Sequence, residues 1–153
     1  MSRPEIRFYH LQTQSLERAL PALVAKAYGG GHRIHIRVAD DKTAKTLSEA
    51  IWAHGQNSFI PHGTEKDGAP EHQPIWISTS EDNANDATTL IITNGAEINA
   101  DAAREFTLIC DMFDGNNDAA LSAARTRWKS YKEMECTLTY WQQNERGGWD
   151  HKA

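Results

Sequence analysis

The chain has 153 residues, 39% of them hydrophobic and 24% charged, with a formal net charge of −5 at pH 7. This length and composition predict one globular domain with its own core, and the acidic balance argues against a general nucleic-acid binder, whose affinity comes mainly from neutralising phosphates. The sequence has no run of about 20 apolar residues that could span a membrane, and its first residues lack the apolar segment of a secretion signal, so we expect a cytoplasmic protein.

The first part of the chain predicts strands that alternate with helices. Residues 6–11 read as an aromatic-rich strand, residues 15–28 as a helix with apolar side chains at helical spacing, and residues 33–38 as a strand that alternates between apolar and polar. Glycines fill positions 29–31, after a helix, whereas a phosphate-binding loop precedes one. They therefore predict a helix end and a turn.

The next predicted helix carries an unusual tryptophan. Asp40 and Asp41 are suited to cap a helix from about residue 42 to residue 53. Trp52 lies roughly 100° away from the apolar stripe of this helix. Such a tryptophan either packs under the following loop or is exposed for binding, and the pattern favours neither.

The remaining elements complete an α/β pattern. We expect strands at residues 75–78, 90–93 and 106–110, a turn or two of helix within 96–104, a long helix from Asn116 or Asn117 to about residue 134, and a further edge strand at 137–141. This order is typical of a central, mostly parallel sheet flanked by helices. We expect a single domain over residues 1–142 and a mobile polar tail over residues 143–153.

The sequence offers little support for catalysis. None of the seven histidines has a partner at the usual spacing of zinc ligands, and Cys110 and Cys136 predict two unpaired thiols. There is no nucleophile elbow and no phosphate or dinucleotide motif. Asp111 and Asp114 follow a predicted strand, where α/β proteins place active-site acids, and leave a small metal- or nucleotide-dependent enzyme as an alternative. Otherwise we expect no catalytic residue, no cofactor and no metal.

The last predicted helix is the strongest candidate for a binding site. Residues 125–132 contain four basic side chains, two aromatic ones and no acid. Helical spacing places Arg125, Trp128 and Lys132 on one face, with Lys129 beside it and Arg127 pointing away. A solvated face is the commoner explanation of such a helix. The functional alternatives are a ligand that is both anionic and apolar, or single-stranded DNA.

Several segments in order resemble the chi subunit family of bacterial DNA polymerase III. They are Phe8-Tyr9-His10-Leu11, Ser15-Leu16-Glu17-Arg18-Ala19-Leu20, Leu47-Ser48-Glu49-Ala50-Ile51-Trp52-Ala53, Ser58-Phe59-Ile60-Pro61-His62 and Arg125-Thr126-Arg127-Trp128-Lys129-Ser130-Tyr131-Lys132. The resemblance implies a Rossmann-like fold without a nucleotide-binding loop. It also implies a non-catalytic clamp-loader subunit that joins single-stranded-DNA-binding protein to the psi subunit, so that DNA contact is mainly indirect. An iron–sulfur helicase is an alternative partner in some bacteria.

The resemblance also implies residue roles. Chi subunits bind the acidic C-terminal tail of single-stranded-DNA-binding protein, which ends in Asp-Phe, and bind psi through a different surface. The tail-binding positions fall on Trp52, Arg125, Trp128 and Lys129. Their chemistry predicts Arg125 on the terminal carboxylate, Lys129 on the acidic side chains, and both tryptophans on apolar groups. Arg127 and Lys132 would add long-range attraction. Trp128 stands where the family often has tyrosine.

Overall fold

The computed structural model describes residues 4–54, 60–93, 98 and 100–153. In chain order these residues form β1 (Glu5–Leu11), α1 (Leu16–Gly29), β2 (Ile34–Arg37), α2 (Asp41–Ala53), β3 (Gly63–Thr64), a short 3-10 helix (Pro70–His72), β4 (Ile75–Ser78), β5 (Thr89–Thr93), α3 (Ala100–Ala103), β6 (Leu108–Asp114), α4 (Asp118–Lys132), β7 (Thr137–Gln143) and β8 (Trp149–His151). No helix among these described residues is long and apolar enough to cross a membrane.

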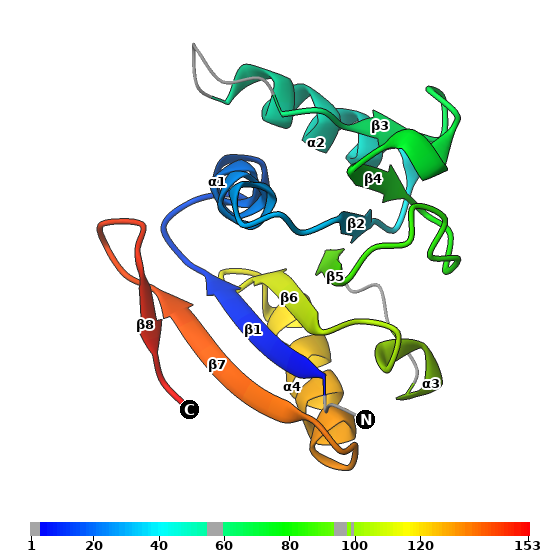
Figure 1. The fold of residues 1–153 in the computed structure, drawn as a ribbon. Helices are drawn as coiled ribbons and strands as arrows, with labels where there is room; N and C mark the ends of the chain where they lie inside the picture. Colours follow the sequence, from blue (N-terminus) through cyan, green and yellow to red (C-terminus); the bar gives the residue numbers. More distant parts are fainter. Residues whose placement is uncertain (1–3, 55–59, 94–97, 99) are drawn as a thin grey trace.

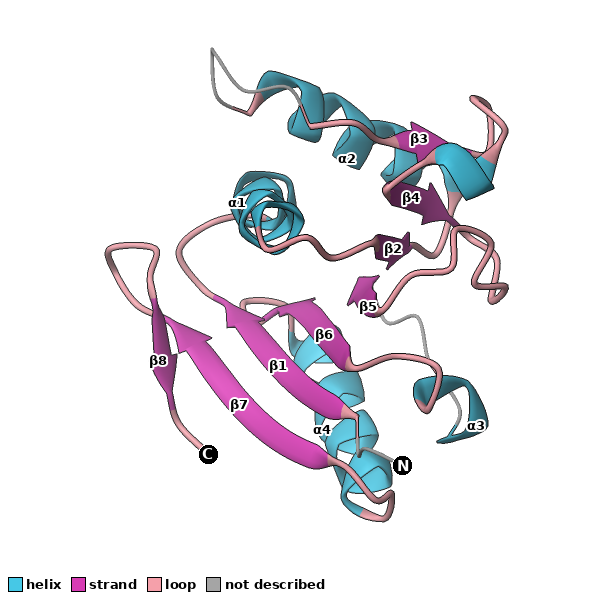
Figure 2. Cartoon of the chain, viewed as in Figure 1, coloured by secondary structure: helices cyan, strands magenta, loops and turns pink. Residues whose placement is uncertain are grey.

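One sheet organises the described chain (Figure 2). Its strand order is β3-β4-β2-β5-β6-β1-β7-β8, and every neighbouring pair is parallel except β7 and β8. The predicted α/β fold with a mostly parallel sheet is therefore confirmed. The predicted glycine turn is present as well, because the Gly30 amide donates to the Lys26 and Ala27 carbonyls at the end of α1.

The helices cover opposite faces of the sheet (Figure 1). Leu20 of α1 and Leu47 of α2 belong to one core cluster, whereas Ala103 of α3 and Tyr131 of α4 belong to the other. Alternation along the strands supplies both clusters, because successive side chains point to opposite faces. This division decides which functional side chains can meet.

Strand β6 differs from its prediction. The sequence indicates residues 106–110, followed by a turn with Asp111 and Asp114, but the strand runs from Leu108 to Asp114. Asp111 lies within it and is only 1% exposed. A buried carboxylate is tolerated in a strand only when it is paired, and its partner is described below.

The end of the chain also differs from the expectation of a mobile tail from residue 143. Gln143 closes β7, and its side-chain oxygen accepts the backbone amides of Gln12, Thr13 and Gln14 at 3.2, 3.0 and 2.9 Å. β8 then pairs with β7, and Trp149 packs its ring against Tyr9 with 4.9 Å between centroids. A polar composition here reflects hydrogen bonds to a loop and to a neighbouring strand.

Candidate functional site

Helix α4 presents the basic side chains on one flank and buries the opposite side. Asn117 caps its start, since its side-chain oxygen accepts the Ala120 amide at 2.9 Å. Ala124, Arg127 and Tyr131 are buried. Trp128 is half-buried beside them, and the remaining basic side chains, Arg125, Lys129 and Lys132, are exposed.

Arg127 lies elsewhere than the sequence indicates. It is 5% exposed and donates from Nε and Nη2 to the two carboxylate oxygens of Asp111, at 2.7 and 2.8 Å. Burial raises the pKa of Asp111, and the arginine counteracts that shift. The expected role of Arg127 in attracting a ligand is therefore corrected. Helical periodicity predicts that a charged side chain off the apolar stripe is exposed. This prediction is wrong for Arg127, because Asp111 on β6 provides a buried partner.

Trp128 forms the aromatic part of the exposed flank. Its ring meets the edges of Phe8 and Tyr140, with centroids 5.2 and 5.6 Å apart and near-perpendicular planes. The Nζ of Lys132 lies 5.7 Å from the centre of the indole ring, a cation–π distance. Phe8 and Tyr140 thus hold the indole in place, and Lys132 adds a positive charge beside it. Such a surface can bind a ligand that has an apolar group next to an anionic one.

His10 and Tyr140 join this flank, although the sequence did not single them out. His10 Nδ1 and the Tyr140 hydroxyl are 2.5 Å apart. Burial lowers the pKa of His10, and the positive charge of Arg125 lowers it further. Burial raises the pKa of Tyr140, and Arg125 opposes that shift. Period-2 alternation from Ile6 through Phe8 could have placed His10 on this face.

These residues define the α4 surface: Arg125, Trp128, Lys129, Lys132, His10 and Tyr140. It combines an arginine fork, two lysines and a row of aromatic rings. A fork can bond both oxygens of a carboxylate, and ammonium groups attract further acids as point charges. The arrangement can bind an anionic peptide or strand.

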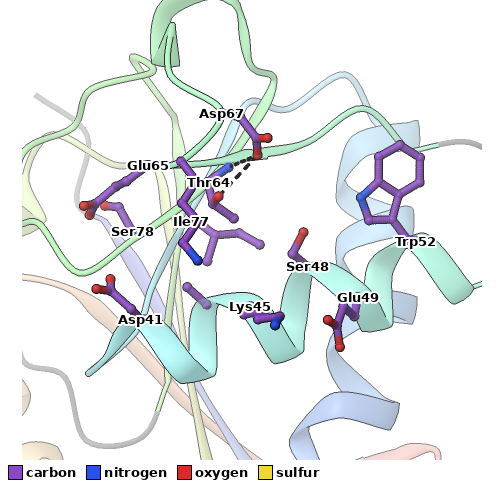
Figure 3. A pocket seen from close by; sticks show the side chains of 12 residues that line it. Asp41, Lys45, Ser48, Glu49, Trp52, Thr64, Glu65, Asp67, Ile77 and Ser78 are labelled. Carbon is purple, nitrogen blue, oxygen red and sulfur yellow. Dashed lines mark hydrogen bonds between the residues drawn. The ribbon is translucent and has the colours of Figure 1, made fainter.

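Trp52 lies at the end of α2 (Figure 3). The buried side chains of α2 belong to the core cluster on the opposite face of the sheet from α4. Trp52 is 58% exposed. Its ring centre lies 5.0 Å from that of His62, whose Nε2 is 3.0 Å from the Ser48 hydroxyl. Trp52 and Trp128 therefore do not share one site. Ser58 and Phe59, which precede His62 in the family pattern, lie outside the described residues.

The hollow beside Trp52 has acidic walls. It measures about 460 Å³ and lies between α2 and the segment 64–67, where the Thr64 amide donates to Asp67 at 2.8 Å. Its charged lining residues are Asp41, Glu49, Glu65 and Asp67 against Lys45 and Lys66, a net −2. We call these residues and Trp52 the Trp52 surface. Its charge opposes an acidic ligand, so the tail-binding role inferred for Trp52 is not supported.

The two acids on which the enzyme alternative rests, Asp111 and Asp114, both have other partners. Asp111 is engaged by Arg127, and Asp114 is exposed and accepts the Asn116 amide at 2.9 Å in the turn before α4. Within the described ranges no cluster of three histidine, cysteine or acidic residues could hold a metal ion. Neither Cys110 nor Cys136 forms a disulfide; burial raises the pKa of the Cys110 thiol to about 12, and the Cys136 thiol donates to the Tyr131 carbonyl at 3.3 Å.

Comparison with known proteins identifies a family. The family model described as "DNA polymerase III chi subunit, HolC" matches residues 3–139. The chain is 29% identical to the chi subunit of Escherichia coli, over 77% of this chain and 79% of that protein. It is 28% identical to the chi subunit of Haemophilus influenzae, over 78% and 82%. A probable chi subunit of Rickettsia prowazekii is 29% identical over 61% of this chain and 57% of that protein.

A solved structure shows the same fold in a different setting. The C-terminal domain of Dbp5 from S. cerevisiae, in a complex with Gle1 and IP6, superposes with a TM-score of 0.55 over 91% of this chain and 90% of that chain. The sequences are 14% identical. This likeness supports the α/β architecture. It concerns the fold alone, because folds of this class serve many unrelated functions.

Proposed function

Since the chain belongs to the DNA polymerase III chi subunit family, we propose that it links single-stranded-DNA-binding protein to the clamp loader through the psi subunit. The family comprises accessory rather than catalytic subunits of this polymerase, so the chain has an accessory role in DNA replication. The proposed place of action is the replisome in the bacterial cytoplasm. An iron–sulfur helicase is the alternative partner to psi.

The α4 surface is the proposed dock for the tail of single-stranded-DNA-binding protein. Arg125 binds the terminal carboxylate, because its planar fork can bond both oxygens. Trp128 and Tyr140 receive the terminal aromatic side chain through edge contacts. Lys129 and Lys132 attract the acids that precede it. The observation that supports this most is the juxtaposition of Arg125 with an aromatic wall on one exposed flank.

The Trp52 surface is the proposed dock for the second partner. An exposed tryptophan over a hollow is the kind of side chain that dominates protein interfaces. Its acidic surroundings favour a partner with basic and apolar side chains, and disfavour the acidic tail. Two docks on opposite faces would allow both partners to bind at once, which a linking subunit requires.

A titration with a labelled tail peptide tests the first dock. Arg125→Ala should weaken binding by about tenfold or more, because a charge-assisted hydrogen bond contributes roughly 1.5–3 kcal/mol. The matched control is Arg18→Ala, an exposed arginine of α1 outside both surfaces. A peptide amidated at its C-terminus should bind the native chain as weakly as the free peptide binds the variant. Undiminished binding of the tail peptide by Arg125→Ala would contradict the proposal that Arg125 binds the terminal carboxylate.

Formation of a ternary complex tests the linking role itself. The chain is mixed with psi and with single-stranded-DNA-binding protein, and the mixture is separated by size with light-scattering mass detection. A species that contains all three proteins is the expected result. Mutual displacement of the two partners would contradict the proposal, because it would place both on one surface.

A further inference from the structure

The sheet has an open region on the face that α1 covers in part. α1 packs against β2, β6 and α2, while β7 and β8 extend beyond it (Figure 1). Strands of a parallel sheet normally lie beneath helices on both faces and are apolar on both. Here β1 carries Glu5 and Arg7 on this face, both half-exposed and joined by an ion pair at 2.5 Å. The face is built for contact with water or with a ligand.

A hollow of about 670 Å³ lies between this open region and α1. Small ligands usually occupy sites of this size. Three basic side chains line it: Arg7 from β1, Lys26 from α1 and His32 from the following turn. No acid is among the described residues that line it, and Glu5 stands at its edge on Arg7. Arg7 is paired with Glu5, so Lys26 supplies the uncompensated positive charge among the described lining residues, and this charge favours an anionic occupant.

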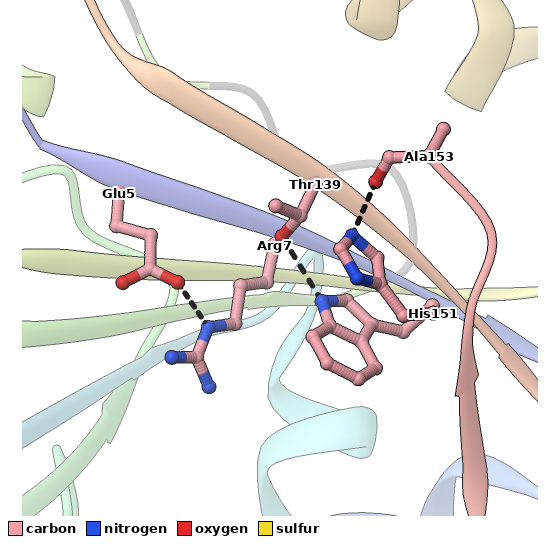
Figure 4. A network of polar contacts seen from close by, with 6 residues as sticks. Glu5, Arg7, Thr139, His151 and Ala153 are labelled. Carbon is pink, nitrogen blue, oxygen red and sulfur yellow. Dashed lines mark hydrogen bonds and ion pairs between the residues drawn. The ribbon is translucent and has the colours of Figure 1, made fainter.

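Aromatic rings form the opposite wall. Trp141 of β7 and Trp149 of the β7–β8 hairpin line the hollow, and Trp149 rests on Tyr9. Trp141 stacks on His151 of the neighbouring strand, with ring centres 4.6 Å apart and planes 14° from parallel. Its indole nitrogen donates to the Thr139 hydroxyl at 3.0 Å, beside Arg7 (Figure 4). Flat rings next to cations on an open sheet are how many domains hold single strands.

An unpaired hydroxyl gives a second, independent indication. Thr89 of β5 lines the hollow, is 1% exposed, and its Oγ1 has no hydrogen-bond partner. Buried hydroxyls are nearly always paired, with protein, water or ligand. A donor at the bottom of a cationic hollow suits a phosphate or base oxygen.

We propose that this hollow, lined by Arg7, Lys26, Thr89 and Trp141, binds one or two nucleotides of single-stranded nucleic acid together with His151, which stacks on Trp141. Phosphate oxygens lie against Lys26 and Arg7, and bases stack along Trp141 and His151. The contact is local and separate from the α4 surface. It would hold the strand close to the protein that coats it, beyond the linking role proposed above.

Anisotropy of a labelled short oligothymidylate, titrated with the whole chain at low salt, tests this site. His151→Ala removes an exposed ring, and Trp141→Leu replaces an indole by an aliphatic side chain. Each should weaken binding by about tenfold, because stacking of a base contributes roughly 1–3 kcal/mol. Lys26→Gln should lower the slope of log affinity against log salt by about 0.7, as expected for one lost contact to a single-strand phosphate.

Matched variants separate this site from the others. Arg18→Gln on the same helix and Arg125→Gln on the α4 surface should leave oligothymidylate binding unchanged. Loss of binding in Arg125→Gln alone would overturn the proposal and place the strand on α4. Absence of binding by the native chain would overturn it too. So would displacement of the strand by the tail peptide.

Discussion

The α4 surface and the Trp52 surface both present a tryptophan beside charged side chains, but they differ in charge, burial and place. On α4 the indole is half-buried on Phe8 and bordered by cations. On α2 the indole is 58% exposed above a hollow of net −2 charge. The helices lie on opposite faces of the sheet (Figure 1). The family resemblance implied that both tryptophans bind one ligand, and the fold separates them.

A second contrast lies within α4 itself. Arg125 and Arg127 are two residues apart, so they point about 200° apart around the helix. Arg125 is exposed, whereas Arg127 is held by Asp111 beneath the helix. One arginine is thus available to a partner, and the other stabilises the packing that positions Trp128. Each contrast can be tested by substitution.

Arg127→Ala should produce the largest effect, on stability. It leaves the buried Asp111 carboxylate without its partner, which costs roughly 3–5 kcal/mol in the free energy of unfolding. Arg125→Ala should change that free energy by less than about 0.5 kcal/mol, as exposed substitutions usually do. Urea unfolding followed by circular dichroism measures both. The double variant Arg127→Met with Asp111→Leu should recover most of the loss. Equal changes in the free energy of unfolding for Arg127→Ala and Arg125→Ala would contradict the different roles of the two arginines.

Trp52→Ala should produce the next largest effect, on one partner only. Affinity for psi should fall about thirtyfold, since truncation of an interface tryptophan often costs about 2 kcal/mol. Affinity for the tail peptide should stay within error. Calorimetry with each partner in turn gives both values, and Glu17→Ala on α1 serves as a control. An equal loss of affinity for the tail peptide would contradict the separation of the two surfaces, because it would show that Trp52 also contributes to tail binding.

Lys129→Ala should have a moderate effect on the tail alone. Removal of one exposed ammonium should lower affinity about threefold at low salt, because such pairs contribute up to about 1 kcal/mol. The difference from the native chain should vanish at high salt, where exposed charges are screened. Lys45→Ala on the Trp52 surface is the matched control and should not lower tail affinity. Persistence of the Lys129 effect at high salt would contradict a role as a point charge.

A second effect of about threefold concerns pH and His10. Burial, then Arg125, lower the pKa of His10 below its usual value, so the ring is neutral at pH 7 in the unbound chain. A bound carboxylate favours the charged ring and raises that pKa. Binding then takes up a proton at His10. Tail affinity should therefore rise about threefold as the pH falls below the ordinary pKa of histidine. Peptide titrations across this range should lose the trend in His10→Gln. A trend retained in that variant would assign it to another group.

The sequence predicted the elements well, because periodicity is a local property. The strands, the glycine turn after α1 and the capped helices α2 and α4 are all present. The candidate site was predicted less completely. Arg127 was misplaced because its partner Asp111 lies on a strand that the pattern ended too early. Pairing of β1 with β7 brought His10 to Tyr140, a contact between residues 130 positions apart that no local pattern encodes.

The indole N–H signals of the five tryptophans provide the most direct test of two separate surfaces. A ¹⁵N–¹H correlation spectrum, assigned by single substitutions, is recorded while the tail peptide is added to the whole chain. The Trp128 indole signal should shift in proportion to occupancy, and the Trp52 signal should stay in place. A shift of Trp52 equal to that of Trp128, at the same peptide concentration, would contradict the account.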